Sequence, residues 1–365
     1  MEISMQQYAA NKKIQVLVVD DSAYMRKAIR EMLEQNSSIQ VIGTAHHGLD
    51  ALEQIERLQP DVVTIDLYMP EMDGVDFTRT QMARRPIPIV VCSSAEIDGD
   101  RAVAAMEAGA VEFVRKPTNR ALDKVYDIRQ DIQQAVLTAA AIAPDKLLVS
   151  PEVLTENRIP VRATLPTRAA QGGTGRIDAV LIGISTGGPR ALRQMLPRFP
   201  VEMAVPIVIA LHMPVGYTAS LAKRLNELSA LEVLESDDGI ELISGRIILA
   251  QAGKHTRLRR RIDGKLEVEV SELPRGTLYC PSVDELFRSG AEVLGSRVLG
   301  VVMTGMGNDG TAGAAWIKAQ GGLMYAEAES STVVFGMPRA AQEAGVIDRM
   351  VDLEELPNQI MEAVL

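Results

Sequence analysis

The segment Gly183-Ile-Ser-Thr-Gly-Gly-Pro189 holds a serine in a setting suited to nucleophilic catalysis. It follows an apolar run and satisfies G-x-S-x-G, the pattern of a strand-to-helix turn that exposes a serine hydroxyl. Its glycines permit a tight turn, and backbone N–H groups at the start of the following helix could bind an anion. A hydroxyl alone is a weak nucleophile, so Ser185 needs a base.

The chain has four histidines, and any mechanism that needs an imidazole must use one of them. His46 and His47 lie in the N-terminal half, away from the serine motif. His212 ends the next apolar run, so we expect it at the same sheet edge as Ser185. His255 lies in a predicted polar turn before several arginines, which makes it the reserve candidate.

A third partner, an acid, would orient the imidazole. Asp309 lies in Gly305-Met-Gly-Asn-Asp-Gly310, which joins the apolar run 298–304 to a predicted helix, so it should reach the same edge. Asp284 is a rival, but its place after Pro281-Ser282 indicates a charge in the first turn of a helix. The order Ser, His, Asp differs from the order in α/β-hydrolases, so that fold is not expected.

The loop 305–310 also satisfies G-x-G-x-x-G, a pattern of dinucleotide-binding domains. Glu327 follows Gly310 by 17 residues, near the position of a ribose-binding acid. However, Asp309 would repel a pyrophosphate, and only 55 residues follow Gly310, too few for a second nucleotide-binding half. For single residues, a connecting turn at Ser185 or a structural role for His212 are plainer alternatives.

Three carboxylates end two predicted strands of the N-terminal half, Asp20 and Asp21 the first and Asp66 the third. The carboxyl ends of parallel strands form a ligand crevice, where clustered carboxylates repel one another unless a cation binds between them. Oxygen ligands of this kind suit Mg²⁺. Ser93 and Lys116 end two further strands and could hold a phosphoryl group by a hydrogen bond and by charge.

Helix capping is a simpler explanation for acids at strand ends, since Asp21 or Ser22 could cap the helix that follows. Capping would account for one carboxylate. It would not account for Asp66 followed by Leu-Tyr-Met-Pro70, nor for Lys116-Pro117.

Apolar runs that alternate with amphipathic segments predict the elements that position these residues. In the first half, five such pairs predict a parallel sheet covered on both faces. The predicted strands are 14–20, 39–43, 61–66, 89–93 and 111–116, and the predicted helices lie near 22–35, 48–58, 74–84, 99–109 and 119–137.

Prolines and the run Gln171-Gly-Gly-Thr-Gly175 predict a linker over 138–176. A second α/β pattern follows it. We therefore expect two doubly wound parallel-sheet α/β domains, residues 1–137 and 177–365. The second has predicted strands at 179–184, 206–211, 231–235, 246–250, 266–270, 298–304 and 322–326, and helices near 188–198, 217–228, 282–294, 310–320 and 354–364.

Composition limits the class of function. The 365 residues are 47% hydrophobic and 24% charged, as in soluble globular proteins, and a net charge of −10 disfavours a nucleic-acid binder. No apolar run is long enough for a membrane helix, and the N-terminus lacks the apolar region of a secretory signal. Two cysteines fit a reducing cytoplasm and exclude a disulfide framework.

The N-terminal motifs resemble those of response-regulator receiver domains, which implies a flavodoxin-like (βα)5 fold. The resemblance implies that Asp66 accepts phosphate from a histidine kinase, with Mg²⁺ held by Asp20, Asp21 and Asp66. Phe113 matches the aromatic residue that reorients on phosphorylation, and His47 stands where the family often has Asp or Asn. The matching segments are Val18-Val-Asp-Asp-Ser22, Asp66-Leu-Tyr-Met-Pro-Glu-Met-Asp-Gly74, Ser93 and Lys116-Pro117.

The C-terminal motifs resemble the catalytic domain of chemotaxis protein-glutamate methylesterases. The resemblance implies that Ser185 is the nucleophile, His212 the base and Asp309 the orienting acid. It also implies an oxyanion contact from the Met306 backbone N–H and a further site contact by Thr186. The matching segments are Gly183-Ile-Ser-Thr-Gly-Gly-Pro189, Leu211-His-Met-Pro214, Pro281-Ser-Val-Asp284, Met303-Thr-Gly-Met-Gly-Asn-Asp-Gly310 and Val334-Phe-Gly-Met-Pro338.

Together the resemblances imply phosphorylation-activated hydrolysis of glutamate γ-methyl esters on the cytoplasmic helices of methyl-accepting chemoreceptors, with deamidation of selected receptor glutamines. They imply Mg²⁺ for the receiver, no cofactor for the esterase, a histidine kinase as phosphodonor, and a cytoplasmic protein without nucleic-acid binding or membrane insertion. The alternative from another class is a phosphorylation-controlled binding protein with a nucleotide-binding or inactive C-terminal domain. A DNA-binding regulator is disfavoured, because the output half is acidic and shows no helix-turn-helix.

Overall fold

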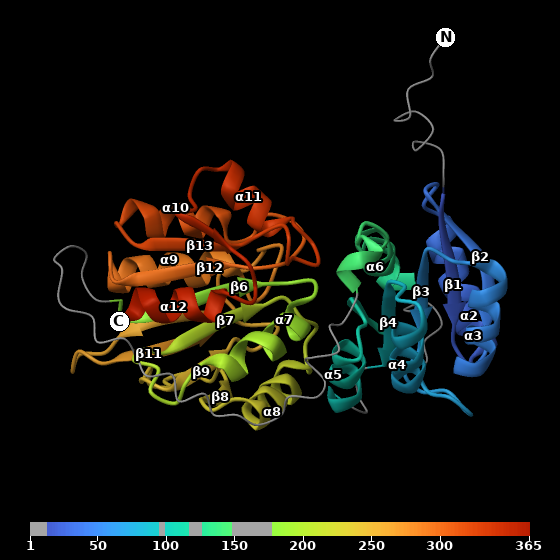
Figure 1. Cartoon of the computed structure of the whole chain (residues 1–365), viewed down its shortest axis with the longest axis horizontal. Coiled ribbons are helices and arrows are strands. Elements are labelled where there is room, and N and C mark those ends of the chain that lie inside the picture. Colours follow the sequence, from blue (N-terminus) through green and yellow to red (C-terminus); the bar gives the residue numbers. More distant parts are fainter. Residues whose placement is uncertain (1–12, 95–98, 117–125, 148–176) are drawn as a thin grey trace, which may run out of the picture. The chain divides into compact units, whose positions relative to one another are not determined.

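The computed structural model describes residues 13–94, 99–116, 126–147 and 177–365 (Figure 1). It divides the chain into two compact units, residues 1–149 and 150–365, and each is described by itself. Residues 148–176, most of the predicted linker, lie outside the described residues. The bounds 1–137, 138–176 and 177–365 therefore stay a prediction.

The first unit contains a five-stranded parallel sheet in the order β2-β1-β3-β4-β5, as in flavodoxin-like folds. The interior strands β1 and β3 are largely buried, and their sequences are apolar apart from Gln15 and Thr64. The strands are β1 (Ile14–Val19), β2 (Ile39–Ala45), β3 (Val62–Ile65), β4 (Ile89–Ser94) and β5 (Glu112–Lys116).

Helices and 3₁₀ turns accompany this sheet in the part of the unit that the structure describes. They include α2 (Ala23–Glu34), α3 (Gly48–Leu58), α4 (Gly74–Arg84), α5 (Gly99–Glu107), α6 (Arg129–Ala140) and the turn η2 (Pro144–Leu147). The α6 helix ends three residues beyond the predicted segment 119–137, whose first part overlaps residues 117–125, outside the described ones. The expected alternation of strands and helices is confirmed.

The second unit contains a seven-stranded parallel sheet in the order β14-β13-β12-β6-β7-β9-β8. The chain runs outward from β6 to one side and later returns to fill the other, so β6 lies beside the point where the strand order reverses. The strands are β6 (Ala179–Ile184), β7 (Ile207–Leu211), β8 (Glu232–Glu235), β9 (Arg246–Leu249), β12 (Val298–Val302), β13 (Leu323–Glu327) and β14 (Arg349–Val351).

Helices pack on this sheet, and α9 contributes a large part of the core through Val283, Leu286 and Phe287. The helices are α7 (Gly188–Met195), α8 (Thr218–Leu228), α9 (Val283–Leu294), α10 (Thr311–Ala319), α11 (Met337–Glu343) and α12 (Leu356–Val364), with the 3₁₀ turn η4 (Leu196–Arg198) after α7. Among the described residues, no helix combines the length and apolar character needed to cross a membrane.

Two features of the second unit differ from the sequence prediction. Residues 255–260 form β10 (His255–Arg260), which pairs antiparallel with β11 (Leu266–Ser271) in a separate hairpin. The predicted polar turn at His255 is therefore wrong: Thr256 and Leu258 are buried while Arg259 is exposed, the alternation of a half-buried strand. The short elements β14 and α11 were also missed.

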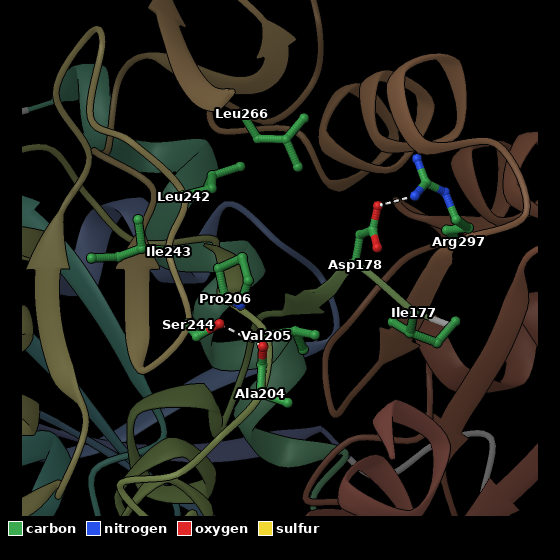
Figure 2. Close-up of a pocket in the computed structure, with 10 residues that line it drawn as sticks. All are labelled: Ile177, Asp178, Ala204, Val205, Pro206, Leu242, Ile243, Ser244, Leu266 and Arg297. Atoms are coloured by element: carbon green, nitrogen blue, oxygen red, sulfur yellow. Dashed lines mark hydrogen bonds and ion pairs between the residues drawn. The ribbon is translucent and has the colours of Figure 1, made fainter. Parts of the chain in front are cut away.

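A cavity of about 720 Å³ lies at the amino ends of the central strands (Figure 2). Its lining includes Asp178 before β6, Pro206 before β7 and Arg297 before β12, with Asp178 and Arg297 paired at 2.8 Å. Ligand crevices of open parallel sheets lie at the opposite, carboxyl ends of the strands. This cavity is therefore separate from the edge at which Ser185 was predicted.

A glycine sets the approach of α9 to the sheet. Gly183 in β6 is buried, and a Cβ at this position would overlap the Val283 side chain. We expect Gly183→Ala to lower the free energy of unfolding by about 1–3 kcal/mol through overpacking, as measured by urea denaturation. The double variant with Val283→Ala is the control, because it removes the atoms that overlap. Additive losses in the double variant would contradict this explanation.

Candidate active site

Ser185 directly follows the central strand β6, in a tight turn that leads into α7. The Ser185 N–H donates to the Thr304 carbonyl at 2.9 Å, and the Gly188 N–H donates to the Ser185 carbonyl at 2.7 Å. Gly187 has φ +79°, which a glycine adopts without strain. A Cβ on Gly305 would lie 2.6 Å from the Ser185 Cβ, so the loop after β12 passes directly against the serine.

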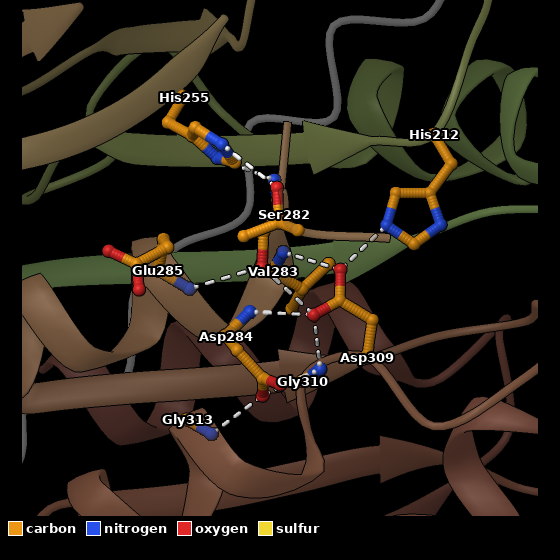
Figure 3. A network of polar contacts seen from close by, with 10 residues as sticks. His212, His255, Ser282, Val283, Asp284, Glu285, Asp309, Gly310 and Gly313 are labelled. Carbon is orange, nitrogen blue, oxygen red and sulfur yellow. Dashed lines mark hydrogen bonds and ion pairs between the residues drawn. The ribbon is translucent and has the colours of Figure 1, made fainter. Parts of the chain in front are cut away.

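His212 and Asp309 meet at this same edge. The backbone N–H of His212 donates to the backbone carbonyl of Ile184, the residue before Ser185, at 3.1 Å. The His212 Nε2 atom lies 2.8 Å from the Asp309 Oδ2 atom (Figure 3). Because β12, β6 and β7 are neighbours, their carboxyl ends bring the acid, the serine and the histidine together.

Donors from the start of α9 surround the Asp309 carboxylate. They are the Val283 N–H at 2.8 Å, the Asp284 N–H at 3.0 Å and the Ser282 hydroxyl at 3.1 Å. Burial alone would raise the pKa of Asp309, but the hydrogen bond and charge of His212 and these N–H groups outweigh it and lower the pKa. The carboxylate is therefore held in its ionised form.

An ionised carboxylate only accepts hydrogen bonds, so the Nε2 atom of His212 must be the donor to Asp309. The neutral imidazole then carries its lone pair on Nδ1. This Nδ1 atom is buried, and among the described residues it has no hydrogen-bond partner. The arrangement leaves Nδ1 of His212 as the nitrogen that can accept a proton.

Tyr279 is a site residue that the sequence analysis missed. Its ring stacks on the His212 ring with centroids 4.1 Å apart and an interplanar angle of 5°. A Cβ on Gly307 would lie 3.0 Å from the Tyr279 hydroxyl, so the tyrosine also borders the 305–310 loop. The signal was an aromatic residue next to the Pro281-Ser282 motif in a chain with only 4% aromatic residues.

The remaining implied contacts lie on the same loops. Thr186 is buried, and its carbonyl accepts a hydrogen bond from the Thr304 hydroxyl at 3.0 Å. Met306 is half-exposed in the loop that passes Ser185. The structure thus places both residues beside the serine.

The reserve candidates have structural partners. His255 is buried, its Nδ1 accepts from the Ser282 N–H at 3.2 Å, and its Nε2 lies 3.2 Å from the Thr277 hydroxyl. Glu327, the acid of the dinucleotide-binding alternative, is buried and accepts from the Thr304 N–H at 2.9 Å. The Glu327 carboxylate therefore stabilises the loop after β12, which weakens the interpretation of Glu327 as a ribose-binding acid.

A second group of polar residues lies at the carboxyl ends of the strands in the first unit. Asp20, Asp21 and Asp66 each offer a carboxylate oxygen, and these atoms lie within 4.8 Å of one another. Hard oxygen donors at this spacing fit a divalent cation such as Mg²⁺. Ser22, whose hydroxyl accepts from the Met25 N–H, is the cap of α2, so capping does not explain the acids.

Lys116 ends β5 in the middle of this pocket. Its Nζ atom lies 2.6 Å from both Asp20 Oδ2 and Asp66 Oδ2. Burial alone would lower the pKa of Lys116, but the two carboxylates outweigh this and raise it, so the side chain is cationic. Burial also raises the pKa of Asp20, against the effect of Lys116.

Ser93 and Phe113 complete the predicted pocket. Both are buried, on the adjacent strands β4 and β5. Only 1% of the Ser93 surface is exposed, and the Ser93 hydroxyl has no hydrogen-bond partner among the described residues. A buried hydroxyl without a partner costs free energy, which a bound oxyanion would recover.

Comparison with known proteins shows the class to which these units belong. Residues 16–125 match the response regulator receiver domain family, and residues 180–360 match the CheB methylesterase family. The catalytic domain of Thermotoga maritima CheB methylesterase is 38% identical, with a TM-score of 0.50, and the match covers 51% of this chain and 98% of that domain.

Similar proteins extend over nearly the whole chain. Protein-glutamate methylesterase/protein-glutamine glutaminase 5 of Myxococcus xanthus is 44% identical, over 93% of this chain and 95% of its own. A second such protein, from Oleidesulfovibrio alaskensis, is 41% identical over 96% of this chain and 99% of its own. The chain therefore belongs to the protein-glutamate methylesterase/protein-glutamine glutaminase family, and it combines a receiver domain with a methylesterase domain.

The Tyr279 stack generates a prediction. We expect Tyr279→Ala to lower kcat/KM for ester hydrolysis roughly twofold to tenfold, because the imidazole of His212 loses the ring that stacks on it. This range corresponds to the free energy of one aromatic contact. Tyr279→Phe keeps the ring and should stay near the wild-type rate. An equal loss in both variants would show that the hydroxyl matters rather than the stack.

Proposed function

We propose that the second unit hydrolyses glutamate γ-methyl esters on chemoreceptors, releases methanol, and deamidates selected receptor glutamines. The names of the similar proteins support both reactions. The observation that carries the proposal is the 2.8 Å contact between His212 and Asp309 at the edge where Ser185 follows β6. Methyl esters and primary amides share a carbonyl carbon and a small leaving group, so one acyl-transfer mechanism serves both.

In this mechanism the Ser185 hydroxyl attacks the ester carbonyl while Nδ1 of His212 takes its proton. The imidazolium then protonates the departing methoxide, and methanol leaves an acyl-serine. His212 next removes a proton from water, whose oxygen attacks the acyl-serine. The imidazolium then returns this proton to the Ser185 oxygen as the glutamate leaves. With a glutamine substrate, ammonia leaves in place of methanol. Asp309 fixes the tautomer of the neutral imidazole and stabilises the imidazolium once it forms.

Backbone N–H groups would stabilise the oxyanion that forms at the carbonyl. We assign this role to the Met306 N–H, with Thr186 as a further contact. The close approach of Gly305 to Ser185 supports the assignment, because it brings the following peptide group next to the attacking oxygen.

We propose that the first unit controls this reaction through phosphorylation of Asp66 by a histidine kinase. Asp20, Asp21 and Asp66 would hold Mg²⁺, which neutralises charge during phosphoryl transfer. Lys116 would then pair with the phosphoryl oxygens, the Ser93 hydroxyl would donate to them, and Phe113 would reorient. We further propose the bounds 1–137, 138–176 and 177–365 for receiver, linker and esterase, and a cytoplasmic location.

Replacement of the nucleophile tests the catalytic assignment. Ser185→Ala removes the attacking oxygen, so methanol release from methylated receptor should fall by about a thousandfold or more. Ser220→Ala, on the partly exposed face of α8, is the matched control and should keep full activity. Substantial methanol release by the Ser185 variant would refute the assignment. Failure of wild type to react with a serine-directed reagent, together with NAD binding, would favour the nucleotide-binding alternative.

Replacement of the phosphate acceptor tests the control. A small phosphodonor with Mg²⁺ should raise the esterase rate of the wild-type chain. Asp66→Asn should keep the basal rate and lose this increase, because the amide cannot form the acyl phosphate. Asp76→Asn, an exposed acid of α4, should respond like wild type. Stimulation of the Asp66 variant, or none in wild type, would reject control through Asp66.

A further inference from the structure

The helix α10 starts at a residue that cannot cap it. Gly310 is the N-cap, with φ +94° and no side chain to accept the N–H groups of the first turn. An acid from the neighbouring helix takes that role. The Asp284 Oδ1 atom accepts from the Gly310 N–H at 2.9 Å and from the Gly313 N–H at 2.7 Å (Figure 3).

The neighbouring helix α9 is capped from the opposite direction. Asp309, the residue before Gly310, accepts from the N–H groups of Val283 and Asp284, the first two residues of α9. Each helix therefore receives a carboxylate from the start of the other. The Asp309 Oδ2 atom that accepts from Val283 is also the one that contacts His212.

The two helix starts are packed so closely that a side chain does not fit between them. A Cβ on Gly313 would lie 2.7 Å from the Phe287 Cβ and 2.8 Å from the Asp284 carbonyl oxygen. The glycine leaves its N–H open to Asp284, and the packing prevents the helices from sliding past each other.

Asp284 is partly buried and Asp309 is buried, and the two acids can lie close together because N–H groups at the starts of both helices donate to them. Burial raises the pKa of Asp284, and the charge of Asp309 raises it further, while the N–H groups of Gly313 and Gly310 act in the opposite sense. Three further titratable groups belong to this network. His212 contacts Asp309, Tyr279 stacks on His212, and His255 accepts from the Ser282 N–H. The Gly310 N–H also donates to the Asp309 Oδ1 atom at 3.1 Å, so loss of Asp284 leaves the Gly313 N–H unpaired and removes one of the two carboxylates that hold the start of α10.

We propose that Asp284 is a positioning residue of the esterase. It supplies the side-chain cap that Gly310 lacks at the start of α10, and it thereby holds the 305–310 loop so that Asp309 meets His212 and the Met306 N–H faces Ser185. This inference rests on the proposed methylesterase function. It gives Asp284 a role different from both an orienting acid and a simple first-turn charge. The residue contacts no substrate in this role.

The test compares Asp284→Ala with Glu285→Gln, which removes one charge from the adjacent residue and touches neither Gly310 nor Gly313. Both are assayed for methanol release by the full chain. We expect Asp284→Ala to lower kcat roughly tenfold to a hundredfold with little change in KM, because catalytic groups are displaced by a fraction of an ångström to one ångström. Glu285→Gln should match wild type. Asp284→Asn keeps a carbonyl acceptor and should recover most of the loss.

The split between kcat and KM separates positioning from a general loss of stability. Displaced catalytic groups lower kcat at an unchanged KM, and Asp284→Asn restores kcat because its carbonyl can again accept from the Gly313 N–H. A stability loss alone would lower the folded fraction, which thermal unfolding reports, and would leave the kcat of the folded enzyme unchanged.

The outcomes distinguish the two proposals. Wild type without esterase activity would remove the proposed function. An active wild type with Asp284→Ala as fast as Glu285→Gln, or with a raised KM at an unchanged kcat, would overturn the role of Asp284 alone. If Asp284→Ala does not fold, as judged by thermal unfolding, Asp284→Asn decides: kcat like wild type supports an acceptor role, and a hundredfold loss despite a normal fold overturns it.

Discussion

The ionised state of one buried carboxylate is the constraint on which the arrangement at the carboxyl edge of the second unit's sheet depends. Burial works against the charge of Asp309, and the N–H groups at the start of α9 together with His212 reverse that effect. An ionised Asp309 settles which nitrogen of His212 donates and therefore which one can act as a base. The same Oδ2 atom of Asp309 accepts from the Val283 N–H at the start of α9, so the geometry of the proposed site and the packing of the helix depend on one group.

The two units use the same principle with different partners. In both, parallel strands end in polar residues near the point where the strand order reverses, and helix starts or a buried cation stabilise the carboxylates there. In the first unit Lys116 lies between Asp20 and Asp66, 2.6 Å from each, and balances their charge. In the second unit backbone N–H groups do this work, so a cation is not needed between Asp309 and Asp284.

Much of the fold could be predicted because short apolar runs alternate with amphipathic segments, and both parallel sheets follow from that alternation. The prediction failed where the signal was short or belonged to another pairing. Arg257 and Arg259 make the sequence of β10 look like a polar turn, although Thr256 and Leu258 are buried. In the structure these arginines pair with acids: Arg257 with Glu285, and Arg259 with Glu267 at 2.6 Å.

The sequence alone determined which polar residues end the strands, because strand ends can be read from the chain and strands of a parallel sheet end at a common edge. It therefore predicted that Ser185, His212 and Asp309 lie at one sheet edge, and that the residues of the receiver pocket lie at another, namely Asp20, Asp21, Asp66, Ser93 and Lys116. Only the tertiary structure decided that Nε2 of His212 faces Asp309, that Tyr279 stacks on the imidazole, and that Asp284 caps α10. These contacts join residues far apart in the chain, and their geometry depends on how closely two helices and a loop pack, which no local pattern of residues records.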